Sequence, residues 1–303
     1  MTAGRPAPRT PGPLFLIGGA EDRKGERTIL RRVVEAAQGK GVAVITTASD
    51  YPVELGKDYV RAFRALGVED PRILDIRSRA DAEEAEPRRE VLAAGAVFFT
   101  GGDQVQLIQT FQGTALLKAI RARHREGVAV AGTSAGAAAS GTVTIFEGET
   151  VGLVKGAVRH CAAFDFLPGT IVDTHFMERG RIARLAQALG AGLTRLGLGV
   201  SEDTAILAHP DGAMEVLGSG VVAVLRSGGD LVSDHADQAS GSVVSVDGIR
   251  LSFFAPGRRF RLERPGRTHS PAQIERPRRT GLGRIFKFLE PWHEYDDNID
   301  RRS

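Results

Sequence analysis

Short apolar runs alternate with amphipathic stretches along the first half of the chain. Each run is closed by glycine or polar residues, as at Leu14-Phe15-Leu16-Ile17 before Gly18-Gly19. Unbroken apolar runs are typical of strands buried on both faces of a parallel sheet, and amphipathic stretches are typical of helices that cover such a sheet. We therefore predict an α/β fold of three layers, a mostly parallel sheet with helices on both faces. The predicted strands are 14–17, 42–46, 72–76, 96–100 and 128–131, and the predicted helices are 26–38, 53–66, 79–94 and 104–123, the last as one helix or two.

The pattern changes after residue 140, where helical stretches become rare. A strand at 170–172 and a helix at 177–189 are followed by short apolar runs separated by turn residues. Such spacing is typical of a β-meander, so we predict a β-rich C-terminal part. Its strands are predicted at 197–200, 205–207, 214–217 and 221–225, with a further hairpin within 241–263.

Composition narrows the class of protein. The chain has 303 residues, of which 42% are hydrophobic and 25% are charged, which fits a folded protein rather than a disordered chain or a coiled coil. The net charge of +3 gives no reason to expect nucleic-acid binding. Cys161 is the single cysteine, so an intrachain disulfide framework and a cysteine-rich zinc site are excluded. No run reaches the roughly 18–20 apolar residues of a membrane span, and no apolar signal segment begins the chain, so we expect a cytoplasmic protein without a membrane partner.

Three parts follow from these patterns. Residues 1–13 contain four prolines and are predicted to be a flexible leader. Residues 14–263 are predicted to form a single α/β domain. Residues 264–303 carry more basic than acidic residues and few apolar ones, so we interpret them as a basic extension that docks on the domain or on a partner.

The strongest local motif is Gly132-Thr133-Ser134-Ala135-Gly136, which comes directly after the predicted strand 128–131. G-x-S-x-G between a strand and a helix is the pattern of a nucleophile elbow, in which a sharp turn exposes the serine. The glycines allow close backbone approach, and the N–H of Ala135 would point at a developing oxyanion. The competing interpretation is a small-residue packing turn.

A serine nucleophile needs a base and an acid that orients the base. His175 follows the predicted strand 170–172 and is the best candidate base, whereas His124 lies at a charged helix end and is predicted to be solvated. Glu202, after another apolar run, is the first choice for the acid, and Glu149 is the second. Sequence order does not decide between them, because such triads are defined by geometry.

Other residues at the predicted strand ends suit binding. The amides of Gly101 and Gly102 could complete an oxyanion hole with Ala135, and Gln104 could bind substrate, although a simple turn capped by Asp103 fits the composition equally well. Arginines near His175 suit carboxylate binding, although a solvated basic face is the commoner meaning of such a run. Asp173 could receive a cationic group. The arginines are Arg179, Arg181 and Arg184.

Five ordered blocks between residues 14 and 225 resemble the cyanophycinase family, in the serine peptidase clan that also holds aspartyl dipeptidase. The blocks are Leu16-Ile17-Gly18-Gly19-Ala20-Glu21-Asp22, Phe99-Thr100-Gly101-Gly102-Asp103-Gln104, Gly132-Thr133-Ser134-Ala135-Gly136-Ala137, Asp173-Thr174-His175-Phe176 with the nearby arginines, and Gly199-Val200-Ser201-Glu202-Asp203-Thr204-Ala205.

The resemblance implies a class I glutamine-amidotransferase-like fold with serine as nucleophile. It implies hydrolysis of cyanophycin, a poly-aspartate that carries arginine on its β-carboxylates, to β-aspartyl-arginine dipeptides. By position Ser134 would be the nucleophile, His175 the base and Glu202 the acid. The implied substrate pocket comprises Gln104, Asp173, Thr174, Arg179, Arg181 and Arg184; Thr174 departs from the family, where glutamine is common.

Two other functions compete with this expectation. One is an aspartyl or isoaspartyl dipeptidase of the same clan, and the other is a non-catalytic binding protein with the same fold. No metal or organic cofactor is required by the expected chemistry. The expected partners are an acidic or isoaspartyl peptide substrate, no nucleic acid, and a second copy of the chain in a homodimer.

Overall fold

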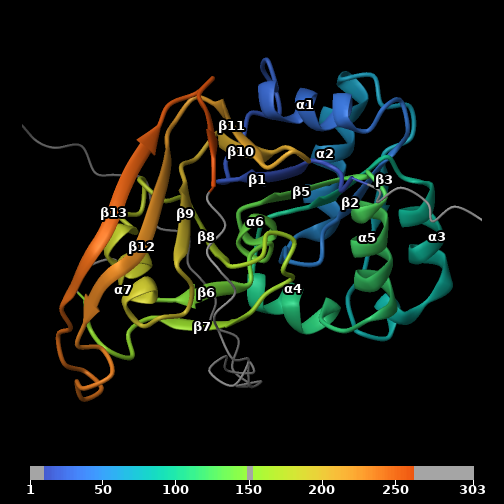
Figure 1. The fold of residues 1–303 in the computed structure, drawn as a ribbon. Coiled ribbons are helices and arrows are strands. Elements are labelled where there is room, and N and C mark those ends of the chain that lie inside the picture. Colours follow the sequence, from blue (N-terminus) through green and yellow to red (C-terminus); the bar gives the residue numbers. More distant parts are fainter. Residues whose placement is uncertain (1–9, 149–152, 263–303) are drawn as a thin grey trace, which may run out of the picture.

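The computed structural model describes residues 10–148 and 153–262, which form two β-sheets and their covering helices (Figure 1). Most of the predicted leader and all of the predicted extension 264–303 lie outside this part, as does Glu149. Within the leader, Gly12 is buried and its N–H donates to the carbonyl of His124 at 2.6 Å. The described fold therefore includes residues that precede Leu14.

The larger sheet has eight strands in the order β14-β11-β10-β1-β5-β4-β2-β3. The strands from β1 to β3 pair in parallel, and β10, β11 and β14 extend the sheet in antiparallel fashion. Its strands are β1 (Leu14–Ile17), β2 (Val42–Ile45), β3 (Arg72–Leu74), β4 (Ala96–Phe99), β5 (Ala129–Thr133), β10 (Thr204–Ala208), β11 (Ala213–Gly218) and β14 (Arg259–Arg261).

Alternating side chains of these strands enter two separate cores. Phe15, Val44 and Phe98 face α1 and α2, whereas Leu16 and Phe99 face α3, α4, α5 and α6. This alternation is the pleat of strands buried on both sides, and it confirms the predicted α/β fold with helices on both faces of a mostly parallel sheet. The helices are α1 (Thr28–Ala36), α2 (Pro52–Ala65), the 3-10 helix η1 (Asp81–Glu83), α3 (Ala85–Ala93), α4 (Gln104–Phe111), α5 (Ala115–Arg125) and α6 (Ala135–Ala138).

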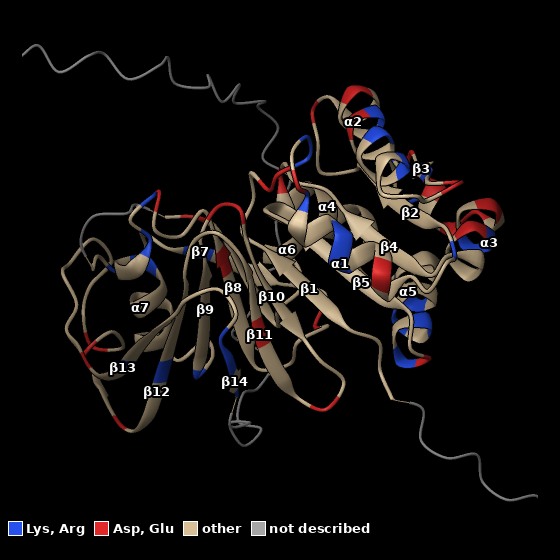
Figure 2. Ribbon diagram, turned by 90° about the horizontal axis from the view of Figure 1, so that it is seen from above, with Lys and Arg blue, Asp and Glu red and all other residues tan. Residues whose placement is uncertain are grey.

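The second sheet has six strands in the order β13-β12-β9-β8-β6-β7. One face packs on α7 through residues such as Leu185 and Leu189, and the other joins the core beneath α4 and α5 through Leu198 and Val224. Figure 2 shows that charged residues lie mainly on the helices and loops around both sheets. The elements are β6 (Val143–Glu147), β7 (Arg159–Ala162), β8 (Thr170–Thr174), α7 (Ile182–Gly190), β9 (Leu196–Val200), β12 (Val222–Ser233) and β13 (Val246–Phe254).

The β-rich C-terminal part is present, but its connectivity differs from the prediction. Consecutive strands β9 and β10 lie in different sheets, so the predicted meander reduces to the β10–β11 pair. The predicted hairpin within 241–263 is wrong, because β13 pairs with β12 and β14 pairs with β11. Short apolar runs indicate strands but carry no information on the sheet to which each belongs. The segment 104–123 forms two helices, and Thr114 caps the second by accepting from Leu117 N.

None of the helices in the described residues is long and apolar enough to cross a lipid bilayer.

Candidate active site

Ser134 lies in a strained turn between β5 and α6. Its φ is 50° and its ψ is −111°, a conformation that a residue with a side chain rarely adopts. A Cβ on Gly132 would collide with the backbone of Gly136, and a Cβ on Gly136 would lie 2.5 Å from the carbonyl oxygen of Phe99. Both glycines of the motif are therefore needed for the turn, which has the geometry of a nucleophile elbow.

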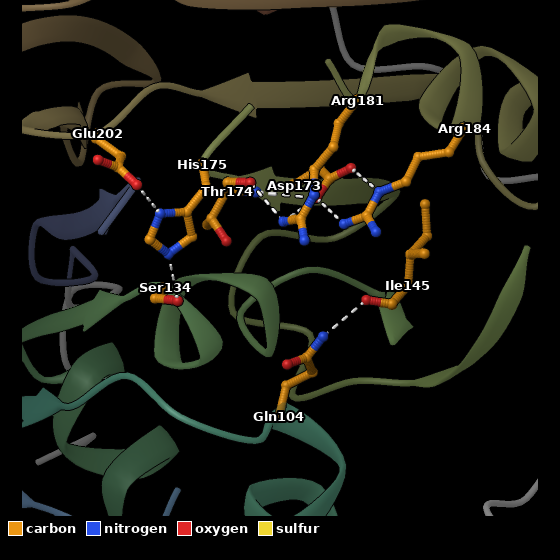
Figure 3. Close-up of polar contacts among 9 residues, drawn as sticks. All are labelled: Gln104, Ser134, Ile145, Asp173, Thr174, His175, Arg181, Arg184 and Glu202. Atoms are coloured by element: carbon orange, nitrogen blue, oxygen red, sulfur yellow. Dashed lines mark hydrogen bonds and ion pairs between the residues drawn. The ribbon is translucent and has the colours of Figure 1, made fainter. Parts of the chain in front are cut away.

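His175 reaches this serine from the other sheet, at the end of β8. Its Nε2 lies 2.9 Å from Ser134 Oγ, and its Nδ1 lies 2.5 Å from Glu202 Oε1 (Figure 3). A carboxylate only accepts, so Nδ1 carries the proton and Nε2 is left to accept from the serine hydroxyl. The backbone of His175 is also in the left-handed region, with φ of 47°. Two strained residues therefore face each other across the junction of the sheets.

Burial lowers the pKa of His175 below its ordinary value of 6.5. The hydrogen bond to Glu202 opposes this shift, and the positive charge of Arg179 adds to it. The imidazole is consequently neutral at pH 7, which is the state that can accept a proton from a serine.

Glu202 follows β9, the strand that pairs in parallel with β8. Parallel pairing brings the carboxyl ends of β8 and β9 together, which places Glu202 beside His175. Its side chain is 38% exposed, so water competes for the carboxylate. Of the two acids considered from sequence, Glu202 contacts the imidazole and Glu149 lies outside the described residues.

The loop after β4 lies against the serine. A Cβ built on Gly101 would lie 3.2 Å from the Cβ of Ser134. Gly102 has φ of 138°, and any side chain there would strike the carbonyl of Ala48. The N–H groups of Gly102 and Ala135 donate to no backbone carbonyl in the part of the chain that is described. Both are therefore available to an oxyanion formed next to Ser134.

The turn at residue 103 also matches the simpler expectation of a helix cap. The carboxylate of Asp103 accepts from Val105 N at 2.7 Å and from Gln106 N at 3.3 Å, which starts α4. Gln104 then projects toward β6, where its Nε2 donates to the carbonyl of Ile145 at 2.9 Å (Figure 3). The loop after β4 therefore both caps α4 through Asp103 and holds Gln104 against β6.

A buried ion-pair cluster lies next to His175. Asp173 is 3% exposed, and Arg184 donates to both of its carboxylate oxygens, with Nε to Oδ2 at 2.7 Å. Arg181 donates to Asp173 Oδ1 at 3.4 Å and to the carbonyl of Thr174 at 2.6 Å (Figure 3). Direct substrate binding by Asp173 or Arg184 would require breaking this ion pair, which is costly in a buried site.

The remaining predicted binding residues differ in exposure. Arg179 is exposed and close enough to His175 to influence its pKa, whereas Thr174 is buried. Arg181 is half-buried, with burial lowering its pKa to about 10, so it remains charged at neutral pH. Of the three arginines near His175, Arg179 and Arg181 are therefore the more exposed, and Arg184 is buried.

Sequence reasoning missed the part played by the loop after β1. His175 N donates to the carbonyl of Gly18 at 2.9 Å, and a Cβ on Gly19 would collide with the imidazole ring. The Gly18-Gly19 pair was recognisable as a turn, but nothing in the local sequence shows which side chain packs on it.

The prediction for His124 is wrong. This side chain is buried, its Nδ1 lies 3.2 Å from the carbonyl oxygen of Val128, and its ring meets Phe166 edge-on. The neighbouring arginines made the helix end look fully solvated, but one helix face still turns toward the core.

Residues 10–148 and 153–262 contain no group of three or more His, Cys, Asp or Glu side chains placed to hold a metal ion.

Comparisons with known proteins identify the family of this chain. The family described as "Peptidase family S51" matches residues 14–216. A cyanophycinase of Geminocystis herdmanii (strain PCC 6308) is 34% identical over 262 residues, covering 85% of this chain and 95% of that protein. A cyanophycinase of Trichormus variabilis (strain ATCC 29413 / PCC 7937) is 36% identical over 255 residues, covering 82% and 85%.

The fold has a solved counterpart. The crystal structure of a peptidase from an acI-B1 Actinobacterium superposes with a TM-score of 0.65 at 21% identity, covering 84% of this chain and 98% of that one. The predicted α/β class and the predicted serine-type peptidase family are therefore both confirmed: this chain belongs to peptidase family S51.

Proposed function

We propose that this chain is an exopeptidase that hydrolyses cyanophycin to β-aspartyl-arginine dipeptides through an acyl-enzyme on Ser134. The observation that carries the proposal is the relay from Ser134 Oγ through the imidazole of His175 to Glu202, with separations of 2.9 and 2.5 Å. The names of the two cyanophycinase relatives support the choice of substrate.

In the first step Ser134 Oγ attacks the backbone carbonyl carbon of the substrate, and its proton passes to Nε2 of His175. The resulting oxyanion accepts hydrogen bonds from the N–H groups of Gly102 and Ala135, with Gly101 leaving room beside the serine. Glu202 stabilises the imidazolium. When the carbon–nitrogen bond breaks, His175 returns the proton to the leaving amine, and the acyl group stays on the serine.

The second step releases the product. A water molecule attacks the acyl carbon and gives its proton to His175, which then protonates Ser134 Oγ as the ester bond breaks. Each proton taken up by the imidazole is returned, so this relay alone completes the cycle.

We assign recognition of the substrate carboxylates to Arg179 and Arg181. Their guanidinium groups suit two-point binding of a carboxylate, and Arg181 is fixed by Asp173 and by the Thr174 carbonyl. Arg184 supports Arg181 indirectly, because it pairs with the carboxylate of Asp173 that holds Arg181 in place. Gln104 is assigned to bind substrate through its Oε1, to which no residue of the described structure donates, while its Nε2 is held by the Ile145 carbonyl.

The test is incubation of the purified protein with insoluble cyanophycin, with soluble products identified by mass spectrometry. We expect β-aspartyl-arginine from the wild type and none from Ser134→Ala, because loss of a triad serine typically slows hydrolysis by about 10⁶-fold. Equal release by both proteins would contradict the proposal.

A fluorophosphonate probe separates the competing functions. Labelling of Ser134 without release of the dipeptide would indicate an intact site for another acidic or isoaspartyl peptide. Absence of both would indicate a binding protein that retains only the fold. Cytoplasmic location and a homodimer are also proposed, and are checked by cell fractionation and light scattering.

A further inference from the structure

The block Ile17-Gly18-Gly19-Ala20-Glu21-Asp22 has no part in the proposed chemistry, yet it contacts the chain at or beside each residue of the relay. Ser134 N donates to the carbonyl of Ile17 at 2.9 Å, and His175 N donates to that of Gly18 at 2.9 Å. Asp203, which follows Glu202, donates through its N–H to the carbonyl of Gly19 at 2.8 Å. One segment therefore holds three chain positions that come from two different sheets.

Glu21 is the unusual member of this segment. Its side chain is buried, with 4% of the residue exposed, and it makes no ion pair with a basic side chain of the described residues. Arg23 lies 5.3 Å from the centroid of the Tyr59 ring but forms no ion pair with Glu21. Hydrogen bonds must therefore offset the cost of burying this carboxyl group, and an apolar side chain would serve simple packing at lower cost.

Two hydroxyl groups supply the hydrogen bonds. Tyr59, from α2, donates to Glu21 Oε1, and Thr133 Oγ1 donates to Glu21 Oε2 at 2.6 Å. Both hydroxyls are buried, and burial together with the charge of Glu21 raises the pKa of Tyr59 well above its ordinary value of 10.0. Tyr59 therefore remains a donor, and Glu21 is fixed from one side by α2 and from the other by β5.

Thr133 is the residue directly before Ser134, so its side chain is the last one fixed by the sheet before the strained turn. A strained backbone persists only where its surroundings over-determine it. The N–H of Ser134 is held by Ile17, and the peptide plane before it is held through Thr133 by Glu21.

We propose that Glu21 is a positioning residue of the serine site, which acts through Thr133 to keep Ser134 Oγ in line with His175. This inference rests on the proposed function, because it takes Ser134 as the nucleophile. It predicts that loss of the Glu21–Thr133 hydrogen bond lowers the reactivity of the serine hydroxyl without removing any group that touches the substrate.

The experiment compares the rate constants for fluorophosphonate labelling of Ser134 in full-length variants, each with its melting temperature. In Thr133→Val, which removes the hydrogen bond, we expect labelling to slow about tenfold, and in Glu21→Gln, which replaces the carboxylate acceptor by an amide, by a smaller factor. Thr133→Ser keeps the hydroxyl and should label at close to the wild-type rate. The double variant should be no slower than Thr133→Val, because the hydrogen bond through which Glu21 acts on the serine is already absent there.

The matched control is Glu215→Gln. Glu215 is another buried carboxylate, on β11, held by Arg32, His209 and Arg259 and separated from β5 by two strands. Its replacement should lower the melting temperature and leave the labelling rate unchanged. Such a pattern would show that slow labelling in the Glu21 and Thr133 variants is not a general effect of lower stability.

Two results would overturn the proposal in distinguishable ways. If the wild type is labelled at Ser134 and both Thr133→Val and Glu21→Gln react at the wild-type rate, the role of Glu21 alone is refuted. If Ser134 of the wild type is not labelled, the nucleophile assignment fails, and the role of Glu21 fails with it.

Discussion

Within residues 10–148 and 153–262, two histidines contact glutamates, and one of the two also faces a nucleophile. In the candidate active site Nδ1 of His175 lies 2.5 Å from Glu202, and its other nitrogen faces Ser134. At the antiparallel edge of the larger sheet, Nε2 of His209 lies 2.9 Å from Glu215. A glutamate–histidine contact is therefore not by itself a sign of catalysis.

The surroundings separate the two pairs. Glu215 also accepts from Arg32 on α1 at 3.1 Å and from Arg259 on β14 at 2.9 Å, so its charge is balanced by arginines that tie three elements together. Glu202 has no such partner in the described structure, and its side chain makes polar contact with His175 alone there. The contacts of Glu215 stabilise an edge of the larger sheet, whereas the carboxylate of Glu202 is left free to stabilise an imidazolium.

Replacing the histidines gives the largest contrast. His175→Ala should slow cyanophycin hydrolysis by about 10⁶-fold, as removal of a triad histidine does. His209→Ala should leave the rate within about twofold and lower the melting temperature, because it removes one hydrogen bond from a structural cluster. Steady-state kinetics and calorimetry on both variants provide the check. A large rate loss in His209→Ala would remove the distinction between the pairs.

Replacing the two glutamates should give the same contrast in hydrolysis rate, with a smaller difference than replacing the two histidines. Glu202→Gln keeps the shape but no longer stabilises the charged imidazolium, and we expect about a 10³-fold loss in kcat. This is less than for a fully buried triad acid, because Glu202 is partly exposed and water screens its charge. Glu215→Gln should keep kcat at the wild-type value. Comparable kcat values for the two variants would contradict the assigned roles.

The sequence predicted the parts of this contrast that depend on local patterns. The elbow around Ser134 was recognisable because G-x-S-x-G comes directly after a buried strand, and His175 and Glu202 follow strands of the same kind. The sequence could not show that Asp173 is already bound by Arg184, because that ion pair depends on how α7 packs on β8. For the same reason the link from Glu21 to Thr133 was not predicted: its two ends lie 112 positions apart in the chain.

The decline of Ser134 labelling at low pH, the acid limb of its pH profile, tests the electrostatics of the His175–Glu202 pair. His175 must be neutral to accept a proton, and burial holds its pKa below 6.5. Labelling of Ser134 should therefore stay at its full rate at pH 6.5 and above, and should fall by half only at the lower pH that equals the pKa of His175. Arg179 contributes to this lowering, so Arg179→Gln should raise the pKa of His175 and move the acid limb to higher pH by a fraction of a unit.

The matched control for Arg179 is Arg259→Gln, which removes an exposed arginine from the second pair. It should leave the acid limb of Ser134 labelling in place. A shift to lower pH in Arg179→Gln, or equal shifts in both variants, would show that Arg179 does not act on the imidazole.

The smallest expected effect concerns the pH dependence of the stability that the His209–Glu215 pair and its arginines contribute. Burial alone would raise the pKa of Glu215, but hydrogen bonds from Arg32, His209 and Arg259 outweigh it and lower the pKa to about 2. Since the folded-state pKa lies below the ordinary 4.5, the cluster stabilises the fold above about pH 4.5 and loses this contribution as the pH falls toward 2. The melting temperature of Glu215→Gln should therefore lie a few degrees below that of the wild type at pH 7, and the gap should narrow on acidification. Calorimetry of both proteins between pH 7 and pH 3 measures the gap, and a gap that stays constant would mean that the arginines do not act through the charge of Glu215.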